Sequence, residues 1–419
     1  MTMEIKRDRY LNQLIDSQGN GLIKIVTGIR RCGKSYLLFK LFADYLLSAG
    51  TPDDHIVRID LENYRNRSMR VPETLIDYID SRINGDGHYY VLLDEIQIVP
   101  HFEEVLNSYL KVSNVDVYVT GSNSRFLSTD IATEFRGRGD EIRLSPLTFA
   151  EYYSAVGGDK SDAWRYYRTF GGLPQVISLR TDDKKIQYLS NLYSTVYKRD
   201  LIERNAIAKA DEFEELLRVV ASSVGAPVNP LRLENTFRSV AHANLSSATI
   251  SRYLGFTAEA FLIEKSLRYD VKGKKYIHTL SKYYFTDLGL RNALTGFRQQ
   301  EESHIMENII YNELRTRGFH VDVGIVETRK RNGGDVTDRT RLEVDFVANL
   351  GSRRYYLQSA LSIPDAGKMR QETRPLLSTG DSFRKVIIVK DNIKAWHTEE
   401  GILVLGLFDF LLTPGSLDF

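Results

Sequence analysis

The sequence has almost no cysteine, almost no net charge and no long apolar run. Cys32 is the single cysteine, so no disulfide can form within the chain, and a lone reduced thiol is typical of the cytoplasm. The formal net charge is +1, so a surface for nucleic acid would have to be a local patch. Neither an apolar run of about 18 residues nor the apolar core of a signal peptide is present. These absences favour a cytoplasmic protein without a membrane partner.

Length and composition indicate several globular domains. Hydrophobic residues make up 42% and charged residues 26% of the 419 residues, which is a globular composition. A chain of this length exceeds one ordinary core and predicts two to four domains, at roughly 100–200 residues each.

The most informative stretch is GIRRCGKS, which fits the phosphate-binding pattern G-x-x-x-x-G-K-S. A β-branched run precedes it and apolar residues at helical spacing follow it, so the chain reads strand, glycine loop, helix. Glycines let successive N–H groups point at a phosphate, Lys34 would reach the β and γ phosphates, and the Ser35 hydroxyl would ligate Mg²⁺. A plain glycine turn with a solvated lysine is the alternative, and the complete context favours nucleotide. The predicted nucleotide-binding residues are Gly28, Ile29, Arg30, Arg31, Cys32, Gly33, Lys34, Ser35 and Tyr36.

A second motif follows about sixty residues later. Residues 89–93 form a continuous apolar run, typical of a parallel strand buried on both faces, and Asp94 and Glu95 come directly after it. In the Walker B pattern Asp94 would hold Mg²⁺ or its water, and Glu95 would activate the attacking water. A strand that ends in a solvated acidic turn is the alternative.

Further polar side chains come after the next predicted strand, residues 115–121. Ser122 or Asn123 is a candidate sensor of the γ-phosphate, or else part of a hydrogen-bonded loop corner. Arg136 and Arg138 lie on a glycine-rich segment, and either one could complete a neighbouring chain's site or form a surface ion pair. The predicted catalytic group therefore comprises Lys34, Glu95, Ser122, Asn123, Arg136 and Arg138.

Taken together, IKIVTGIRRCGKS, LLDEIQ, VYVTGSNS and FRGRGDEIRLSPLTFAEYY resemble one group of bacterial and archaeal AAA-type ATPases. YRTFGGLPQV, SRYLGFTAEAFLI, KYYFTDLGLRNAL and LEVDFVA match the same group, so the resemblance covers essentially the whole chain. It implies an AAA-like α/β P-loop ATPase fold, which the alternation of strands and helices supports independently, with ATP and Mg²⁺ as cofactors. A winged-helix region and a C-terminal domain of poorly defined role follow the ATPase in that group. The predicted domains are an ATPase domain at 1–155, a helical lid at 156–208, a winged helix-turn-helix domain at 209–297 and a nuclease-like domain at 298–419.

The predicted winged-helix domain rests on a run of helices followed by a hairpin. Helices are expected at 211–224 and 230–240, then one from Ser247 and a further one at 257–262, before a strand pair around the turn 272–275. A recognition helix and a basic turn suit double-stranded DNA, but winged helices also serve as protein-contact modules. Both interpretations stay open.

The C-terminal pattern resembles the PD-(D/E)XK nuclease core. A helix at 303–317 carries Glu307, strands are expected at 319–325, 341–348, 355–360 and 385–390 with a helix at 365–377, and residues 327–340 are expected to form an exposed loop. Asp345 stands in the second strand, but the third ends in Gln358-Ser359-Ala360 and lacks the family's lysine. Lys368 is a candidate substitute. We therefore expect the fold without nucleic-acid cleavage.

The leading functional interpretation is an Mg²⁺-dependent ATPase whose nucleotide state governs the winged-helix and nuclease-like modules. One alternative is a DNA-binding regulator that uses ATP as a conformational ligand with little turnover, and another is an ATP-gated metal-dependent nuclease. A homo-oligomer is a further possibility, because an arginine acting in a neighbour's site requires one.

Overall fold

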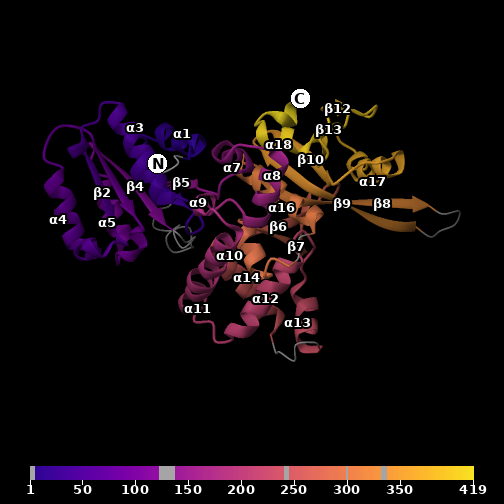
Figure 1. The fold of residues 1–419 in the computed structure, drawn as a ribbon, viewed down its shortest axis with the longest axis horizontal. Helices are drawn as coiled ribbons and strands as arrows, with labels where there is room; N and C mark the ends of the chain where they lie inside the picture. The colour runs from indigo at the N-terminus through magenta and orange to yellow at the C-terminus, as the bar shows by residue number, and fades with distance from the viewer. Residues whose placement is uncertain (1–4, 122–136, 240–244, 299–300, 332–336) are drawn as a thin grey trace. The chain divides into compact units, whose positions relative to one another are not determined.

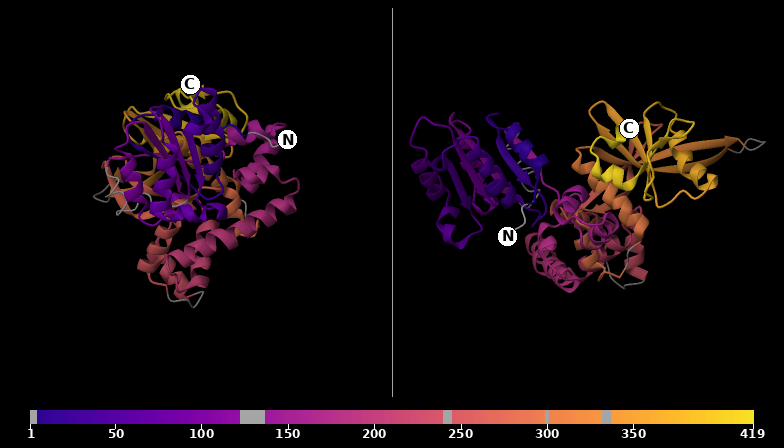
Figure 2. Two further views of the ribbon diagram at one scale, coloured as in Figure 1. Left: turned by 90° about the vertical axis from the view of Figure 1, so that its left-hand side faces the viewer. Right: turned by 45° about the horizontal axis from the view of Figure 1, so that its top comes forward.

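The computed structural model describes residues 5–121, 137–239, 245–298, 301–331 and 337–419. Contacts divide the chain into two units. Unit 1 contains residues 1–146, 173–175 and 259–261, and unit 2 contains residues 147–172, 176–258 and 262–419. Figures 1 and 2 show the ribbon of both. The predicted lid and winged-helix segments fall almost entirely within unit 2.

Unit 1 is built on a five-stranded parallel sheet in the order β2-β3-β4-β1-β5. The sequence predicts β1, β3 and β4, and β5 is an addition that pairs with β1. Since β1 lies between β4 and β5, the order reverses beside the glycine loop, which is where open α/β sheets bind ligands. The strands are β1 Ile23–Thr27, β2 Ile56–Asp60, β3 Tyr89–Asp94, β4 Val115–Gly121 and β5 Gly139–Arg143.

Helices cover both faces of this sheet. The run after the glycine loop is continuous, with a π-helical turn between two α-helical parts. The elements are α1 Asp8–Asp16, α2 Lys34–Tyr36, η1 Leu37–Phe42, α3 Ala43–Ser48, η2 Asp53–His55, η3 Tyr64–Arg70, α4 Pro72–Arg82, η4 Ile96–Ile98 and α5 Phe102–Tyr109.

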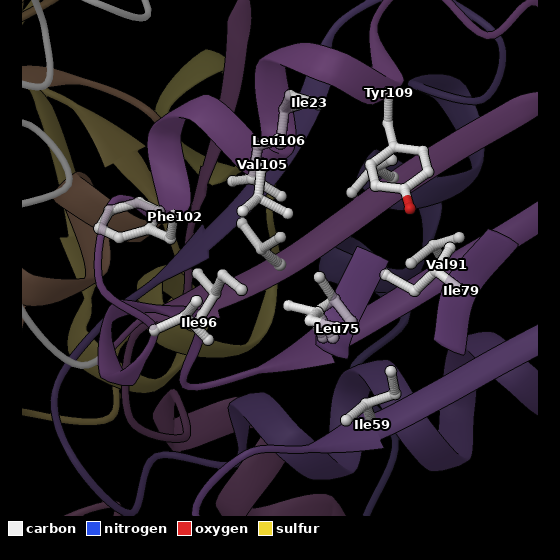
Figure 3. Packing of buried hydrophobic residues seen from close by; sticks show 14 of the residues in the cluster. Ile23, Ile59, Leu75, Ile79, Val91, Ile96, Phe102, Val105, Leu106 and Tyr109 are labelled. Atoms are coloured by element: carbon white, nitrogen blue, oxygen red, sulfur yellow. The ribbon is translucent and has the colours of Figure 1, made fainter. Parts of the chain in front are cut away.

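Alternation along the strands decides which helix meets which face. Figure 3 shows one face, where side chains of α4 and α5 such as Leu75 and Leu106 pack with strand residues such as Val91. On the other face the ring of Phe42, from the run after the glycine loop, contacts Tyr90 and Tyr118. The sheet is therefore buried on both faces, and a ligand could reach it at the edge formed by the carboxyl ends of its strands.

Unit 2 begins with helices, among them three of the four that were predicted before the hairpin. They are α7 Phe149–Val156, α8 Lys160–Phe170, α9 Pro174–Ser178, α10 Asp182–Asn191, η6 Leu192–Lys198, α11 Arg199–Arg204, α12 Ala210–Ser222, α13 Pro230–Ser239 and α14 Ser247–Glu259. The first two residues of α9 belong to unit 1, as does the last residue of α14.

The separate helix predicted at 257–262 is wrong, because α14 runs without a break to Glu259. Gly255 lies inside it, and an interior glycine costs a helix only about 1 kcal/mol relative to alanine. The Thr257 hydroxyl donates to the carbonyl oxygen of Tyr253 at 2.8 Å, so its polar group is satisfied inside the helix. A serine caps the start of α14, since the Ser246 hydroxyl accepts from the N–H of Thr249 at 3.2 Å.

An eight-stranded mixed sheet carries the rest of unit 2, in the order β12-β13-β11-β10-β9-β8-β6-β7. The hairpin strands β6 and β7 belong to this sheet because β6 pairs in parallel with β8. The strands are β6 Ile263–Asp270, β7 Lys275–Phe285, β8 His320–Arg331, β9 Thr337–Leu350, β10 Arg353–Ala360, β11 Arg384–Val389, β12 Trp396–His397 and β13 Leu403–Gly406. The helices are α15 Leu288–Leu294, α16 Glu302–Thr316, α17 Ala366–Leu377, α18 Leu407–Leu412 and η7 Ser416–Asp418.

The exposed loop predicted at 327–340 is also wrong. β8 extends to Arg331 and β9 begins at Thr337, so most of the segment is a two-stranded ribbon that projects from the sheet (Figures 1 and 2). Its ladder pairs Glu327 with Arg341 and continues outward. Backbone hydrogen bonds and opposite charges sustain such a ribbon without apolar residues, which is why its composition resembles that of a loop.

Candidate functional site

The glycine loop adopts a conformation that its glycines require. Gly28 has φ 145°, and a Cβ added there would lie 2.2 Å from the carbonyl oxygen of Leu144. Gly33 has φ 103° and begins the helix as its N-terminal flank. Arg31, exposed between them, also has positive φ, at 66°. The two glycines are therefore needed for close approach and for backbone angles, as the motif predicts.

Lys34 is buried at the centre of this loop. Its ammonium donates to the carbonyl oxygens of Gly28 at 3.1 Å and Ile29 at 3.3 Å. The same nitrogen lies 4.0 Å from Oε1 of Glu95. Lys34 and Glu95, which the sequence assigns to two separate motifs, thus meet at one place.

The strand order brings the magnesium candidates together. Thr120 of β4 stands beside Asp94, because β3 and β4 pair with Leu93 opposite Val119. The Ser35 hydroxyl donates to Asp94 Oδ2 at 2.7 Å, and the Thr120 hydroxyl donates to Asp94 Oδ1. Burial raises the pKa of Asp94, and the two hydrogen bonds oppose that rise.

These oxygens suit the ion that the motif implies. Mg²⁺ takes oxygen ligands, often one or two from the protein and the others from phosphates and water. The Ser35 hydroxyl and the Asp94 carboxylate are such a pair, already within hydrogen-bonding distance of each other. Within the described ranges no group of three or more histidine, cysteine, aspartate or glutamate side chains is arranged to hold a metal alone.

Glu95 is fixed through its backbone and its carboxylate. Its φ of 55° places it in the left-handed region, where a residue other than glycine is strained. Its N–H donates to the Thr120 hydroxyl at 3.0 Å, and its Oε2 accepts a hydrogen bond from Nε2 of Gln97. The sequence interpretation missed both Thr120 and Gln97. The signal for Thr120 is a hydroxyl at the buried end of the strand next to Walker B.

The start of α1 supports the glycine loop. The buried guanidinium of Arg7 donates to the carbonyl oxygens of Cys32 at 3.4 Å and Ser145 at 2.6 Å. The Tyr10 hydroxyl accepts from the N–H of Ser145 at 3.2 Å. Cys32 is buried, and burial raises the pKa of its thiol. The thiol of Cys32 therefore faces the interior of the protein.

Of the remaining predicted catalytic residues, Arg138 lies in the described part of the chain and is apart from this cluster. Ser122, Asn123 and Arg136 lie outside the described residues. Arg138 is exposed and donates to Asn107 of α5 at 3.3 Å. It precedes β5, whose first residue pairs with the first residue of β1, so it lies at the amino edge of the sheet. The nucleotide motifs lie at the opposite, carboxyl edge.

Unit 2 holds a second group of ionisable side chains, around a cavity of about 610 Å³. Glu307 of α16 and Glu343 and Asp345 of β9 line it, and the two β9 acids share one face because they are two residues apart on a strand. Gln358 of β10 also lines the cavity, and its Oε1 accepts from the N–H of Asp345 at 3.3 Å. Its remaining lining residues include Ser303, His304, Leu342, Ser359, Gly367, Arg370, Gln371, Glu372, Arg374 and Pro375.

The lysine at these acids comes from an unexpected element. Lys282 of β7 is buried, and its ammonium lies 2.8 Å from Glu307 Oε1 and 2.8 Å from Glu343 Oε1. Burial alone would lower the pKa of Lys282, but the surrounding carboxylates raise it above the ordinary lysine value. Lys368, the candidate from the sequence, instead pairs with Glu372 one turn further along α17.

Asp345 is held differently. Its Oδ2 accepts from the N–H of Ser359 at 2.8 Å and from the Ser359 hydroxyl at 3.0 Å. Burial, followed by the charge of Glu307, raises the pKa of Asp345 to about 7. At neutral pH this carboxyl is therefore partly protonated.

Comparisons with known proteins agree with the geometry of unit 1. A model of an AAA domain matches residues 20–153, and a model of a domain of unknown function matches residues 161–301. A Walker-type ATPase of Pyrococcus abyssi superposes with a TM-score of 0.51 at 18% identity, over 70% of this chain and 96% of that one. Residues 20–153 thus match an AAA domain, and unit 1 has the fold of a P-loop ATPase.

Two relatives extend beyond that domain. An uncharacterized protein of Haemophilus influenzae is 31% identical over 415 residues, which cover 97% of this chain and 98% of the relative. The chain belongs to the family of that protein. An uncharacterized protein of Methanocaldococcus jannaschii is 25% identical over 363 residues, covering 83% of this chain and 77% of its own. Among the helices of the described part, none is long and apolar enough to span a membrane.

Proposed function

We propose that this chain binds ATP with Mg²⁺ at the carboxyl edge of the unit 1 sheet and hydrolyses it to ADP and phosphate. The observation that carries the proposal is the convergence of Lys34, Ser35, Asp94 and Glu95 at one point, although Ser35 and Asp94 stand 59 residues apart. A glycine turn and an acidic strand end, taken as unrelated features, would not produce that arrangement.

Each side chain has a distinct part in the proposed reaction. Phosphate oxygens compete with the carbonyl oxygens of Gly28 and Ile29 for the Lys34 ammonium, and a charged acceptor gives the stronger hydrogen bond. Ser35 and Asp94 would hold Mg²⁺, which neutralises charge that develops on the phosphates. Glu95 accepts the proton of the attacking water.

Measurements of ATP affinity and of ATP turnover distinguish the role of Lys34 from that of Glu95. Lys34→Ala should remove most of the ATP affinity, whereas Glu95→Gln should keep affinity and stop hydrolysis. ATP and Mg²⁺ at about 100 times Kd should stabilise the folded wild-type chain by about 2.7 kcal/mol, which calorimetry measures as a rise in Tm. No rise at millimolar ATP would contradict the assignment.

Oligomeric action is a further part of the proposal. Because Arg138 lies at the amino edge of its own sheet, it could serve only the site of a neighbouring chain. Turnover should then rise faster than linearly with protein concentration. Mixing Lys34→Ala chains with Arg138→Ala chains should restore part of the activity, and the same mixture with Arg136→Ala chains tests the other arginine. Strictly linear turnover by a proven monomer would exclude action in trans.

We propose that unit 2 is the output of this ATPase, with the predicted domains at 156–208, 209–297 and 298–419 as its parts. Helices α12, α13 and α14 followed by the β6–β7 hairpin support a winged-helix interpretation. The hairpin turn carries exposed Lys272, Lys274 and Lys275, which fit a DNA phosphate backbone. Pairing of β6 with β8 would transmit contacts at the hairpin directly to the C-terminal sheet.

We propose that the nuclease-like sheet serves in binding or assembly and does not cleave nucleic acid. Lys282 neutralises two carboxylates that could otherwise hold a divalent ion, and Gln358 contributes no charge. The test is incubation with DNA and RNA in Mg²⁺ and Mn²⁺, with and without ATP, with Asp345→Ala as the control. Cleavage that disappears in Asp345→Ala would refute the proposal and would make Lys282 the substitute lysine.

A further inference from the structure

Gln97, two residues after the Walker B glutamate, contacts that glutamate directly. It lies in the short turn η4, and its Nε2 donates to Oε2 of Glu95. Its own carbonyl oxygen, Oε1, is buried and has no hydrogen-bond partner within the described part of the chain. A buried acceptor without a donor is uncommon and calls for a reason, such as a water or a ligand that completes it.

The two carboxylate oxygens of Glu95 therefore face different groups. Oε2 is held by the Gln97 amide, while Oε1 faces the Lys34 ammonium at 4.0 Å. The backbone fixes where the side chain starts, because Glu95 lies in the left-handed region and its N–H donates to Thr120, and the hydrogen bond from Gln97 opposes rotation of the carboxylate. The carboxylate is thus oriented before any nucleotide arrives.

We infer that Gln97 positions Glu95 for catalysis and decides which of its oxygens acts as the base. This inference rests on the proposed ATPase function. When Lys34 turns to the phosphates, Oε1 loses its neighbouring cation while Oε2 stays bound to Gln97. Oε1 is then the oxygen that receives the proton, and Oε1 of Gln97 is placed to accept the second hydrogen of the same water.

The reaction balances with these groups. The water oxygen forms a bond to the γ-phosphorus, and the bond from that phosphorus to the oxygen bridging the β and γ phosphates breaks. One proton of the water passes to Oε1 of Glu95, and the bridging oxygen leaves with its electron pair on ADP. Gln97 exchanges no proton, so it acts through orientation alone.

Gln97→Met tests the inference, because methionine keeps the length of the side chain and removes both hydrogen-bonding groups. We expect Kd for ATP and Mg²⁺ to stay within about twofold and kcat to fall about 10- to 100-fold, since a misplaced general base forfeits much of its roughly 10²- to 10⁴-fold contribution. Gln13→Met, on the exposed face of α1, is the matched control and should change nothing.

The possible outcomes test this inference separately from the proposed ATPase function. If the wild-type chain hydrolyses ATP, Glu95→Gln stops it and Gln97→Met keeps the wild-type kcat, then the inference is wrong and the ATPase assignment stands. If Gln97→Met loses ATP affinity and thermal stability in proportion to turnover, then Gln97 is a structural residue and the inference is also wrong. If the wild-type chain shows no turnover, both proposals fail together.

Discussion

Replacing Lys282 with methionine should destabilise unit 2 strongly. The lysine side chain is 4% exposed and its two partners, Glu307 and Glu343, are 8% and 33% exposed. Methionine preserves most of the apolar stem, so the loss is chiefly that of the ammonium. Among the described residues, Glu307 would then be a buried carboxylate whose remaining hydrogen bond comes from the Tyr284 hydroxyl at 2.7 Å.

The size of the stability loss depends on which carboxylate is left buried without a cation. Removing one partner of a buried ion pair costs about 3–5 kcal/mol, because the other charge stays buried without compensation. The pair with Glu343 adds little, because that carboxylate is a third exposed and solvent screens it. We therefore expect a loss of about 3–5 kcal/mol from the Lys282–Glu307 pair. Adding Glu307→Gln removes the stranded charge, so the double variant should recover about 2 kcal/mol or more.

Tryptophan fluorescence in urea is the suitable assay. Trp164 and Trp396 are the two tryptophans of the chain, and both lie in unit 2. Arg165→Met, which breaks the exposed pair with Asp162, is the matched control and should cost less than about 1 kcal/mol. A Lys282→Met chain as stable as wild type, or a double variant whose loss is the sum of the two single losses, would refute the reasoning.

Three further predictions concern unit 2. Asp345→Asn should raise the Tm more at pH 8 than at pH 5. The pKa of Asp345 in the folded protein is raised to about 7, so between about pH 4 and pH 7 the native state holds a proton that the unfolded state has released. The stability of the wild-type protein therefore falls as pH rises towards 7. The gain should be roughly 1–2 kcal/mol above pH 7 once solvent access is allowed for, and a Tm difference that does not change with pH would contradict it. Replacing Lys272, Lys274 and Lys275 by alanine should flatten the slope of log DNA affinity against log salt by two or three units, at about 0.9 per phosphate contact; an unchanged slope would leave the hairpin as a protein-contact surface. No cleavage of DNA or RNA is expected in either metal, as gel analysis of the intact chain would show.

The sequence was most informative where function depends on neighbours in the chain. The residues from Gly28 to Ser35 form a continuous motif, and their strand, loop and helix are as predicted. Asp94 and Glu95 follow the predicted strand directly. The order of the parallel strands then brings the glycine loop and the Walker B acids together, as expected for open α/β sheets, which bind ligands at the carboxyl ends of their strands.

Residues that act through tertiary contacts were missed. Thr120 acquires its position only because β4 lies between β1 and β3. Lys282 reaches Glu343 across 61 positions of sequence, and its strand was predicted only as part of a hairpin with basic residues. The nuclease pattern predicts its lysine at the position of Ala360, with Lys368 as the substitute. A lysine ammonium can, however, enter a cavity from any strand that faces it.

Two secondary-structure errors share a local cause. The ribbon strands at 327–331 and 337–341 consist mostly of polar residues, and they pair with each other in a regular ladder. A separate helix was predicted at 257–262, although α14 continues through Gly255 to Glu259, since an interior glycine costs a helix only about 1 kcal/mol. In both places tertiary context overrides local preference.

The central claim is that this chain is an ATPase with Glu95 as its base. It is tested most directly by measuring ATP affinity and steady-state phosphate release on the same preparations of wild-type and Glu95→Gln protein, in Mg²⁺. The account predicts equal affinity, turnover by the wild type and at least a 100-fold lower rate in the variant, from the loss of a general base worth roughly 10²- to 10⁴-fold. Equal turnover by the two proteins, or no binding by either, would contradict it.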